Sequence, residues 1–225
     1  MTDQVQTTKE KGWQYILLAF ITFFGIALEV VYAFVLGPLV FGKPPDEYST
    51  IQDILHWVVT CITWFFVAYF LINIAKNKLR FDIFNKSNKM KLWQWVAAFL
   101  CIAFALFVGY SQRAGFKVIL EFQHLGWLRF VFQYLYYLAE TVLFLLIIIF
   151  AQKAFEVWTK KKNVPWGGII CAITWGLAHV ISRGYFDIQT GLFATLYGFL
   201  FGTVYLLANR NVTISFVIFF FMFVL

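Results

Sequence analysis

The chain has 225 residues, of which 62% are hydrophobic and 13% are charged, and its mean hydropathy is +0.77. These values exclude a soluble globular protein and indicate an integral membrane protein, with the lipid bilayer as a partner. The net charge of +7 does not predict nucleic acid as a partner, because the basic residues lie in the connections between apolar segments, where membrane topology accounts for them.

Apolar segments along the chain predict an all-α, polytopic membrane bundle of about seven transmembrane helices. A helix that crosses a bilayer needs about 20 mostly apolar residues, so the length allows one transmembrane domain over 1–225 and no separate soluble domain. The expected spans are residues 13–37, 51–75, 92–111, 127–152, 166–182, 191–208 and 212–225.

Two parts of this pattern allow more than one structure. The segment 112–126 is too mixed in polarity to cross a bilayer, and we expect it either to lie along the outer membrane interface or to form an ordinary loop. The last segment, 212–225, is shorter than a full span. It is either a half-span buried against its neighbours or the beginning of a longer segment.

The basic residues predict the topology. The connections 76–91 and 153–165 are rich in lysine and arginine and are separated by two spans, so they lie on the same side of the membrane. Because short basic connections face the cytoplasm, the pattern predicts a multi-pass protein of the cell membrane with a cytoplasmic N-terminus.

Three ionisable residues are expected well inside the spans, namely Glu29, Glu140 and His179. Such groups are costly at membrane depth, so each indicates either a functional site or a structural hydrogen bond. Glu140 and His179 lie on neighbouring antiparallel spans at similar distances from the connection 153–165, which makes a contact possible. The pair could act on a water as base and acid, or it could simply join two helices.

A metal site would need a further ligand from another span. Catalytic zinc usually has three protein ligands, whereas Trp175 and Arg183 lie one helical turn either side of His179 and neither is such a ligand. The glycines Gly198 and Gly202 are four residues apart and predict a close helix contact. We further expect a cavity between the fourth to seventh helices that opens toward the cytoplasm.

The order of these features resembles a known family. Glu140 is followed by a basic connection, by the sequence Trp-Gly-Leu-Ala-His, by a glycine-containing helix and by a last apolar segment. This order resembles the C-terminal half of the CAAX-protease and bacteriocin-processing family of intramembrane proteases, also called Abi, over residues 134–225. The resemblance implies proteolysis near membrane-bound termini by a glutamate-activated water, and in some members a role in bacteriocin maturation or immunity.

The first two motifs of that family are only partly present. The family carries Glu-Glu-x-x-x-Arg on one helix, and here Glu140 matches one glutamate while Ala139 replaces its neighbour and Phe144 stands at the arginine position. The second motif, Phe-x-x-x-His, corresponds to Trp175 and His179. The resemblance therefore assigns one carboxylate and one imidazole to the site.

The third motif of the family, His-x-x-x-Asn, is absent from the sequence. Its histidine and asparagine positions fall on Phe219 and Phe223, whereas Gly198, Gly202 and Tyr205 match the helix that precedes this motif. Phenylalanine side chains cannot supply the preorganised donors that stabilise an oxyanion. The resemblance thus implies a degenerate family member, a pseudoenzyme that keeps the scaffold without the chemistry.

The leading functional prediction is a non-proteolytic membrane protein that binds a peptide, a lipidated terminus or a partner membrane protein, in a regulatory, immunity or complex-subunit role. The candidate binding residues are Tyr136, Tyr137, Phe144, Trp175, Phe219 and Phe223. One alternative is an active protease with Glu140 and His179 as catalytic residues and a divalent metal as its cofactor. Another is a transporter subunit in which these two residues and Glu29 form a proton or cation path.

Overall fold

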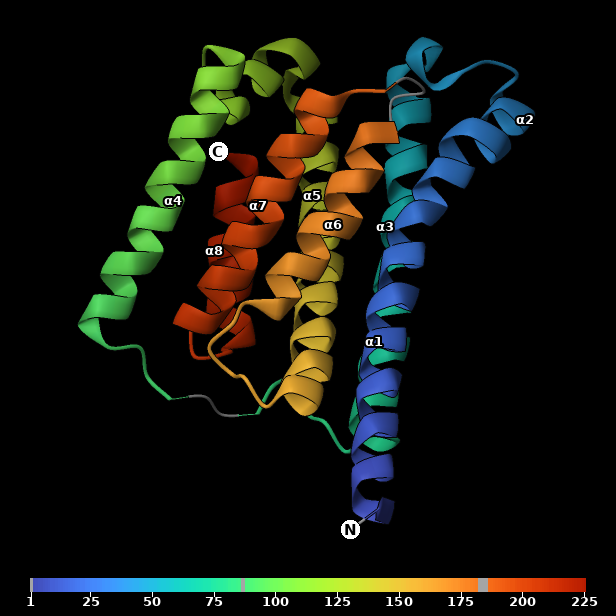
Figure 1. Cartoon of the computed structure of the whole chain (residues 1–225). Coiled ribbons are helices and arrows are strands. Elements are labelled where there is room, and N and C mark those ends of the chain that lie inside the picture. Colours follow the sequence, from blue (N-terminus) through green and yellow to red (C-terminus); the bar gives the residue numbers. More distant parts are fainter. Residues whose placement is uncertain (1, 86–87, 182–185) are drawn as a thin grey trace.

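The computed structural model describes the backbone of residues 2–85, 88–181 and 186–225, and their side chains except those of residues 2–9 and 181 (Figure 1). Within these ranges the chain is all-helical, without strands. The helices are α1 (Thr2–Val31), which continues through a π-helical turn (Tyr32–Leu36) into α2 (Gly37–Phe41), then α3 (Thr50–Asn77), α4 (Leu92–Arg113), α5 (Lys117–Thr159), α6 (Trp166–Ile181), α7 (Ile188–Leu207) and α8 (Val212–Val224).

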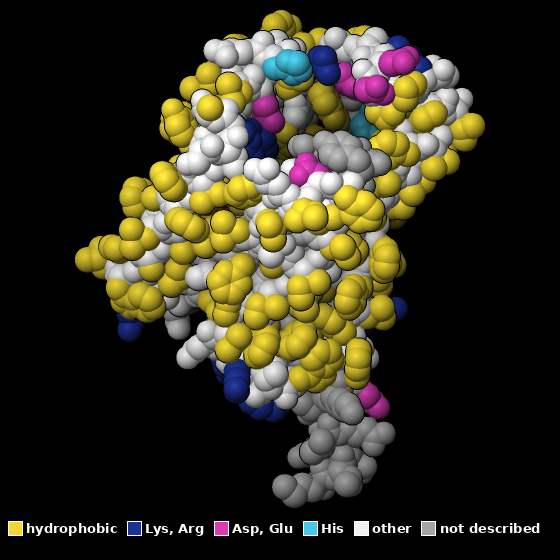
Figure 2. All heavy atoms as spheres, turned by 45° about the horizontal axis from the view of Figure 1, so that its top comes forward, with side chains coloured by type: hydrophobic (Ala, Val, Ile, Leu, Met, Phe, Trp, Pro, Cys, Tyr) yellow, Lys and Arg dark blue, Asp and Glu magenta, His cyan; other side chains and the backbone are white. Residues whose placement is uncertain are grey.

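Each of the seven predicted spans is helical, so the prediction of an all-α bundle is confirmed. Five helices are long and apolar enough to cross a membrane, whereas α6 and α8 are shorter. Apolar side chains cover the flank of the molecule in Figure 2, as a lipid-facing surface requires. The structure is consistent with a membrane protein.

Helix α5 forms the centre of the bundle. It packs against α1 and α3 on one side and against α6 and α8 on the other, while α4 lies at the far side, next to α7 and α8 (Figure 1). Residues 143–152 of α5 are all buried. A helix that is apolar around its whole circumference is buried in this way, because no face of it prefers water.

A sharp bend at Gly126 divides α5 into two parts. The backbone of Gly126 has φ 70° and ψ 169°, a conformation that residues with a Cβ atom essentially do not adopt. The short part before the bend, residues 117–125, is helical and lies across the end of the bundle that is uppermost in Figure 1. The ordinary-loop alternative for 112–126 is therefore wrong for most of this segment.

The turn between α7 and α8 ties the two basic connections together. The Nδ2 atom of Asn209 donates to the carbonyl oxygen of Lys89 at 3.1 Å, and Arg210 donates both to the Glu156 carboxylate at 2.6 Å and to the Lys162 carbonyl oxygen at 2.7 Å. The connections 76–91 and 153–165 consequently lie at one end of the bundle. This confirms that they share a side.

Asp82 stabilises the first of these connections. The backbone N–H of Phe84 donates to its carboxylate at 3.0 Å, and the ammonium group of Lys76 lies 3.2 Å away. The Phe84 N–H and the nearby Lys76 hold the pKa of Asp82 below its usual range.

Candidate binding cavity

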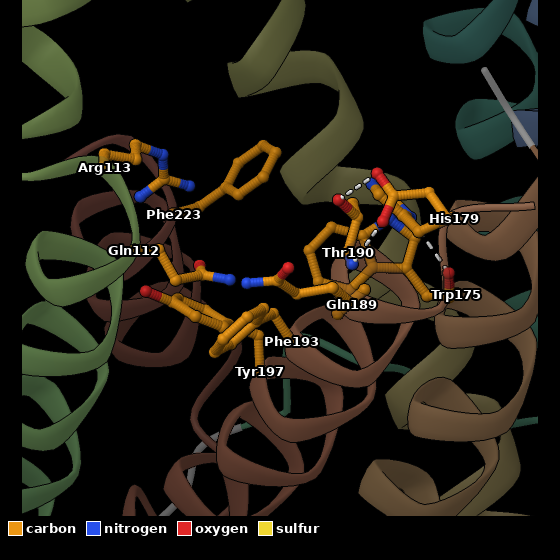
Figure 3. Close-up of a pocket in the computed structure, with 11 residues that line it drawn as sticks. Gln112, Arg113, Trp175, His179, Gln189, Thr190, Phe193, Tyr197 and Phe223 are labelled. Atoms are coloured by element: carbon orange, nitrogen blue, oxygen red, sulfur yellow. Dashed lines mark hydrogen bonds between the residues drawn. The ribbon is translucent and has the colours of Figure 1, made fainter.

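A cavity of about 370 Å³ lies at the end of the bundle opposite the basic connections (Figure 3). It is enclosed by the C-terminal ends of α4 and α6, the N-terminal part of α7 and the end of α8. Its lining residues are Gln112, Arg113, Trp175, His179, Asp187, Gln189, Thr190, Phe193, Ala194, Tyr197 and Phe223. Figure 2 shows a hollow at this end, with basic, acidic and histidine side chains around it.

The position of this cavity corrects the expected direction of opening. We expected the cavity near Trp175 and His179 to open on the side of the basic connections, but it opens at the other end of the bundle. A smaller cavity of about 210 Å³ lies at the basic end, beside Glu156 and Arg210, and neither Trp175 nor His179 lines it.

Close backbone contact between α6 and α7 builds one wall of the cavity. A Cβ atom on Gly198 would lie 2.7 Å from the backbone nitrogen of Ala172, and one on Gly168 would lie 2.8 Å from the Cα atom of Gly202. The predicted close approach at Gly198 and Gly202 is confirmed. Only glycine permits this separation, and it fixes Trp175 and His179 of α6 relative to the lining residues of α7.

His179 lines the cavity and is held by its own helix. Its Nδ1 atom lies 2.9 Å from the carbonyl oxygen of Trp175, and the two rings meet edge to face with their centroids 4.7 Å apart. Because a carbonyl oxygen only accepts, Nδ1 is the donor in this contact. Arg183, one turn beyond His179, lies outside the described residues.

Glu140 is buried behind Trp175 and does not line the cavity. The indole N–H of Trp175 donates to Oε1 of Glu140 at 3.3 Å, and the Glu140 residue is 7% exposed. Within the described residues, no hydrogen bond joins Glu140 to His179. Trp175 instead contacts both residues: its indole N–H bonds to Glu140, and its carbonyl oxygen bonds to His179. The direct contact between Glu140 and His179 that their spacing allowed is therefore not made.

The third intramembrane ionisable residue, Glu29 of α1, belongs to the same polar group. The Tyr136 side chain lies beside the Glu29 carboxylate, and Glu29 and Glu140 lie close enough for their charges to interact. The three ionisable residues predicted at membrane depth therefore lie along one route from α1 through α5 to α6, joined by Tyr136 and Trp175.

An aromatic cluster occupies the interior beside Glu140. The rings of Phe144 and Phe201 are stacked at 4.8 Å, as are those of Phe201 and Phe219, and Phe223 packs edge to face on Trp175 at 5.6 Å. The positions that the resemblance assigns to the third motif, Phe219 and Phe223, thus add two rings to this cluster, and Phe223 contacts Trp175, the hydrogen-bond donor to Glu140.

The structure separates the predicted binding residues into two groups. Trp175 and Phe223 line the cavity. The other four are buried side chains that do not line it, namely Tyr136, Tyr137, Phe144 and Phe219. Phe144 and Phe219 are fully buried, so they fill the core.

Sequence reasoning missed the polar side of the cavity. Gln112 and Arg113 end α4, whereas Gln189 and Thr190 begin α7. In the sequence, these polar residues marked the ends of two predicted spans. They did not show that the end of α4 and the start of α7 lie next to each other in the folded protein.

Lys117 was also missed, and it anchors the end of α8. Its Nζ atom lies 3.2 Å from the carbonyl oxygen of Phe223 and above the rings of Tyr137 and Phe223, at 3.8 and 4.2 Å from their centroids. The Tyr134 hydroxyl donates to the carbonyl oxygen of Val224 at 3.2 Å. These contacts hold the Phe223 ring at the base of the cavity.

Within the described ranges, no group of three or more histidine, cysteine, aspartate or glutamate residues could hold a metal ion. Trp175 contacts both Glu140 and His179. A scan of protein-family models, a search of curated proteins and a search of solved structures find no match to this chain.

Proposed function

We propose that this chain is a multi-pass protein of the cell membrane that binds the end of a peptide, or of a lipidated partner protein, in the cavity between α4, α6, α7 and α8, and that it does not cleave what it binds. Such a protein would serve a regulatory, immunity or complex-subunit role. The cavity volume of about 370 Å³ lies within the usual range of ligand sites.

The burial of Glu140 behind Trp175 is the main support for the proposal that the protein does not cleave its ligand. A general base must lie within hydrogen-bond reach of the water it activates, directly or through one further water. Glu140 is 7% exposed, and the Trp175 ring that binds its carboxylate also forms part of the cavity wall. A peptide in the cavity is therefore separated from the carboxylate by this ring.

The resemblance to the CAAX-protease and bacteriocin-processing family supports the same proposal. The positions that would complement Glu140 hold Ala139, Phe144, Phe219 and Phe223. Phe144 and Phe223 pack against Trp175, the hydrogen-bond donor to Glu140, and Phe219 packs against Phe144. They provide shape and apolar surface but no donor for a tetrahedral intermediate.

The experiment compares cleavage with binding on one preparation. Protein purified into lipid nanodiscs is incubated with a broad peptide library, and new peptide termini are sought by mass spectrometry. Photoreactive leucine in the same peptides maps the site of binding. We expect labelling of the cavity and no cleavage, either by the wild type or by Glu140→Gln.

Cleavage by the wild type that is lost in Glu140→Gln would contradict the proposal and support an active protease. Glu121→Gln is the matched control, because Glu121 is another acidic residue of α5 but does not line the cavity or contact Trp175. A loss of cleavage in both variants would point to misfolding, which size-exclusion chromatography detects.

The proposed orientation places the N-terminus in the cytoplasm and the cavity on the outer side. It rests on the basic connections, which the Asn209–Arg210 turn holds at one end. Single cysteines at Lys43 and Lys160, introduced after the native cysteines are replaced, report it. We expect a membrane-impermeant thiol reagent to label Lys43→Cys in intact cells and Lys160→Cys only after lysis.

A second candidate function is proton transfer, because Glu29, Tyr136 and Glu140 lie near one another inside the bundle. Intramembrane carboxylates on adjoining helices are typical of proton paths. In liposomes, this candidate requires proton flux that Glu29→Gln and Glu140→Gln both abolish, while exposed Glu10→Gln leaves it unchanged.

A further inference from the structure

Arg113 differs from Lys117 and Arg129, two other cations at its end of the bundle. Lys117 has the Glu121 carboxylate at 4.0 Å, and Arg129 has that of Asp53 at 2.6 Å. Within the part of the chain that the structure describes, no carboxylate lies within 4.0 Å of the Arg113 guanidinium. Arg113 therefore brings an unneutralised positive charge to the cavity wall.

Neutral groups fix the position of this charge. One guanidinium nitrogen of Arg113 donates to the carbonyl oxygen of Gly109 at 3.3 Å, and the Tyr197 hydroxyl lies beside the same glycine. That hydroxyl in turn donates to the carbonyl oxygen of Ala105 at 2.7 Å. A guanidinium has five N–H donors, so these contacts orient the group and leave donors for a ligand.

Two side-chain amides lie beside Arg113 across the cavity. Gln112 comes from α4 and Gln189 from α7, and Figure 3 shows their amide groups pointing toward one another. Each amide offers both a donor and an acceptor, as a peptide backbone requires. The rings of Phe193 and Phe223 add apolar surface.

From this arrangement we infer that the cavity recognises the C-terminal carboxylate of its peptide and that Arg113 is the residue that binds it, an inference that rests on the proposed function. A planar guanidinium pairs with a carboxylate through two parallel hydrogen bonds. The paired amides and the limited volume suit the last residues of a peptide.

The test uses two pools of N-acetylated tetrapeptides that carry photoreactive leucine at the third position. One pool has free C-terminal carboxylates and the other is amidated. Each is irradiated with the protein in phosphatidylcholine nanodiscs, and labelled residues are identified by mass spectrometry. We expect the free-acid pool to label cavity residues about tenfold more strongly than the amidated pool, since a charge-assisted pair is lost on amidation.

Arg113→Gln should reduce the ratio of free-acid to amidated labelling to about one. Arg113→Lys should give an intermediate ratio, because lysine keeps the charge but not the planar guanidinium. Lys43→Gln is the matched control: it removes a positive charge from the same end of the bundle but not from the cavity wall, so the preference should stay unchanged. Size-exclusion profiles confirm that each variant is folded.

Equal labelling of the cavity by both pools would overturn the inference while leaving peptide binding intact. Absence of cavity labelling by either pool would overturn the inference and the proposed function together. A preference that persists in Arg113→Gln would remove Arg113 as the recognising residue. If phosphatidylglycerol added to the nanodiscs displaces the free-acid pool through Arg113, a lipid phosphate is the ligand and the inference fails.

Discussion

The contact between α6 and α7 leaves no room for one additional methyl group at Gly198. In Gly198→Ala, the new Cβ atom would lie 2.7 Å from the backbone nitrogen of Ala172, 2.8 Å from its Cα atom and 3.0 Å from the carbonyl carbon of Cys171. Carbon atoms in contact are separated by about 3.5–4.0 Å, so the two helices must move apart by roughly 1 Å. All three opposing atoms belong to the backbone and cannot rotate away.

The expected loss follows from these distances. Overpacking of a tight core costs about 1–3 kcal/mol, and the rigid backbone places Gly198→Ala near the upper end. The higher helix propensity of alanine returns up to about 1 kcal/mol. The net destabilisation is then about 2 kcal/mol, which lowers the melting temperature of a chain of this size by roughly 4–8 °C.

Thermal unfolding of the purified protein, followed by the fluorescence of its 9 tryptophans, measures this change. Gly25→Ala is the matched control, because its Cβ atom would lie 2.9 Å from a side-chain methyl group of Val67, which can shift. If Gly198→Ala is as stable as the wild type, or no less stable than Gly25→Ala, the α6–α7 contact is not as tight as described.

Three further predictions concern polar contacts. Trp175→Phe removes the indole donor of Glu140, so the free energy of unfolding should fall by about 1–3 kcal/mol, and by clearly less in a Glu140→Leu background; equal losses would disprove the contact. Arg210→Ala should cost about 1–3 kcal/mol because it leaves the Glu156 carboxylate without its guanidinium, and simultaneous Glu156→Gln should recover part of that loss in chemical denaturation. Asp82 has a lowered pKa in the folded state, so its contribution to stability is present above the usual carboxyl pKa of about 3.9 and is lost as the pH falls through the lowered pKa. Asp82→Asn should therefore make stability less dependent on pH below about pH 5, and an unchanged profile would refute this.

Hydropathy and spacing along the chain predicted much of the fold. The apolar segments located the seven helical spans, and the spacing of Gly198 and Gly202 predicted a close helix contact, which α7 makes with α6. Both signals are local, because helix length and small-residue spacing act within one or two helices. The bend at Gly126 falls where the mixed segment meets the fourth predicted span.

The site was less accessible to sequence reasoning for two physical reasons. Distance along the helix axis predicted that Glu140 and His179 lie at a similar depth, but it did not give the rotation of either helix about its axis. That rotation determines which side chains face each other, and here Trp175 contacts both residues. The cavity is also built where helix ends meet. Hydropathy shows that the chain leaves the apolar region near Gln112 and Gln189 but not which ends adjoin.

The two walls of the cavity differ in mechanical compliance. In the α6–α7 wall, the two backbones are in direct contact at Gly168 and Gly198, so these helices cannot move closer together. Helix α4 reaches its neighbours through side-chain bonds, from Gln94 to Asn209 at 2.8 Å and from Tyr197 to the Ala105 carbonyl oxygen. A ligand that widens the cavity therefore displaces α4 and strains both bonds, one at the cavity wall on Tyr197 and the other near the opposite end of α4.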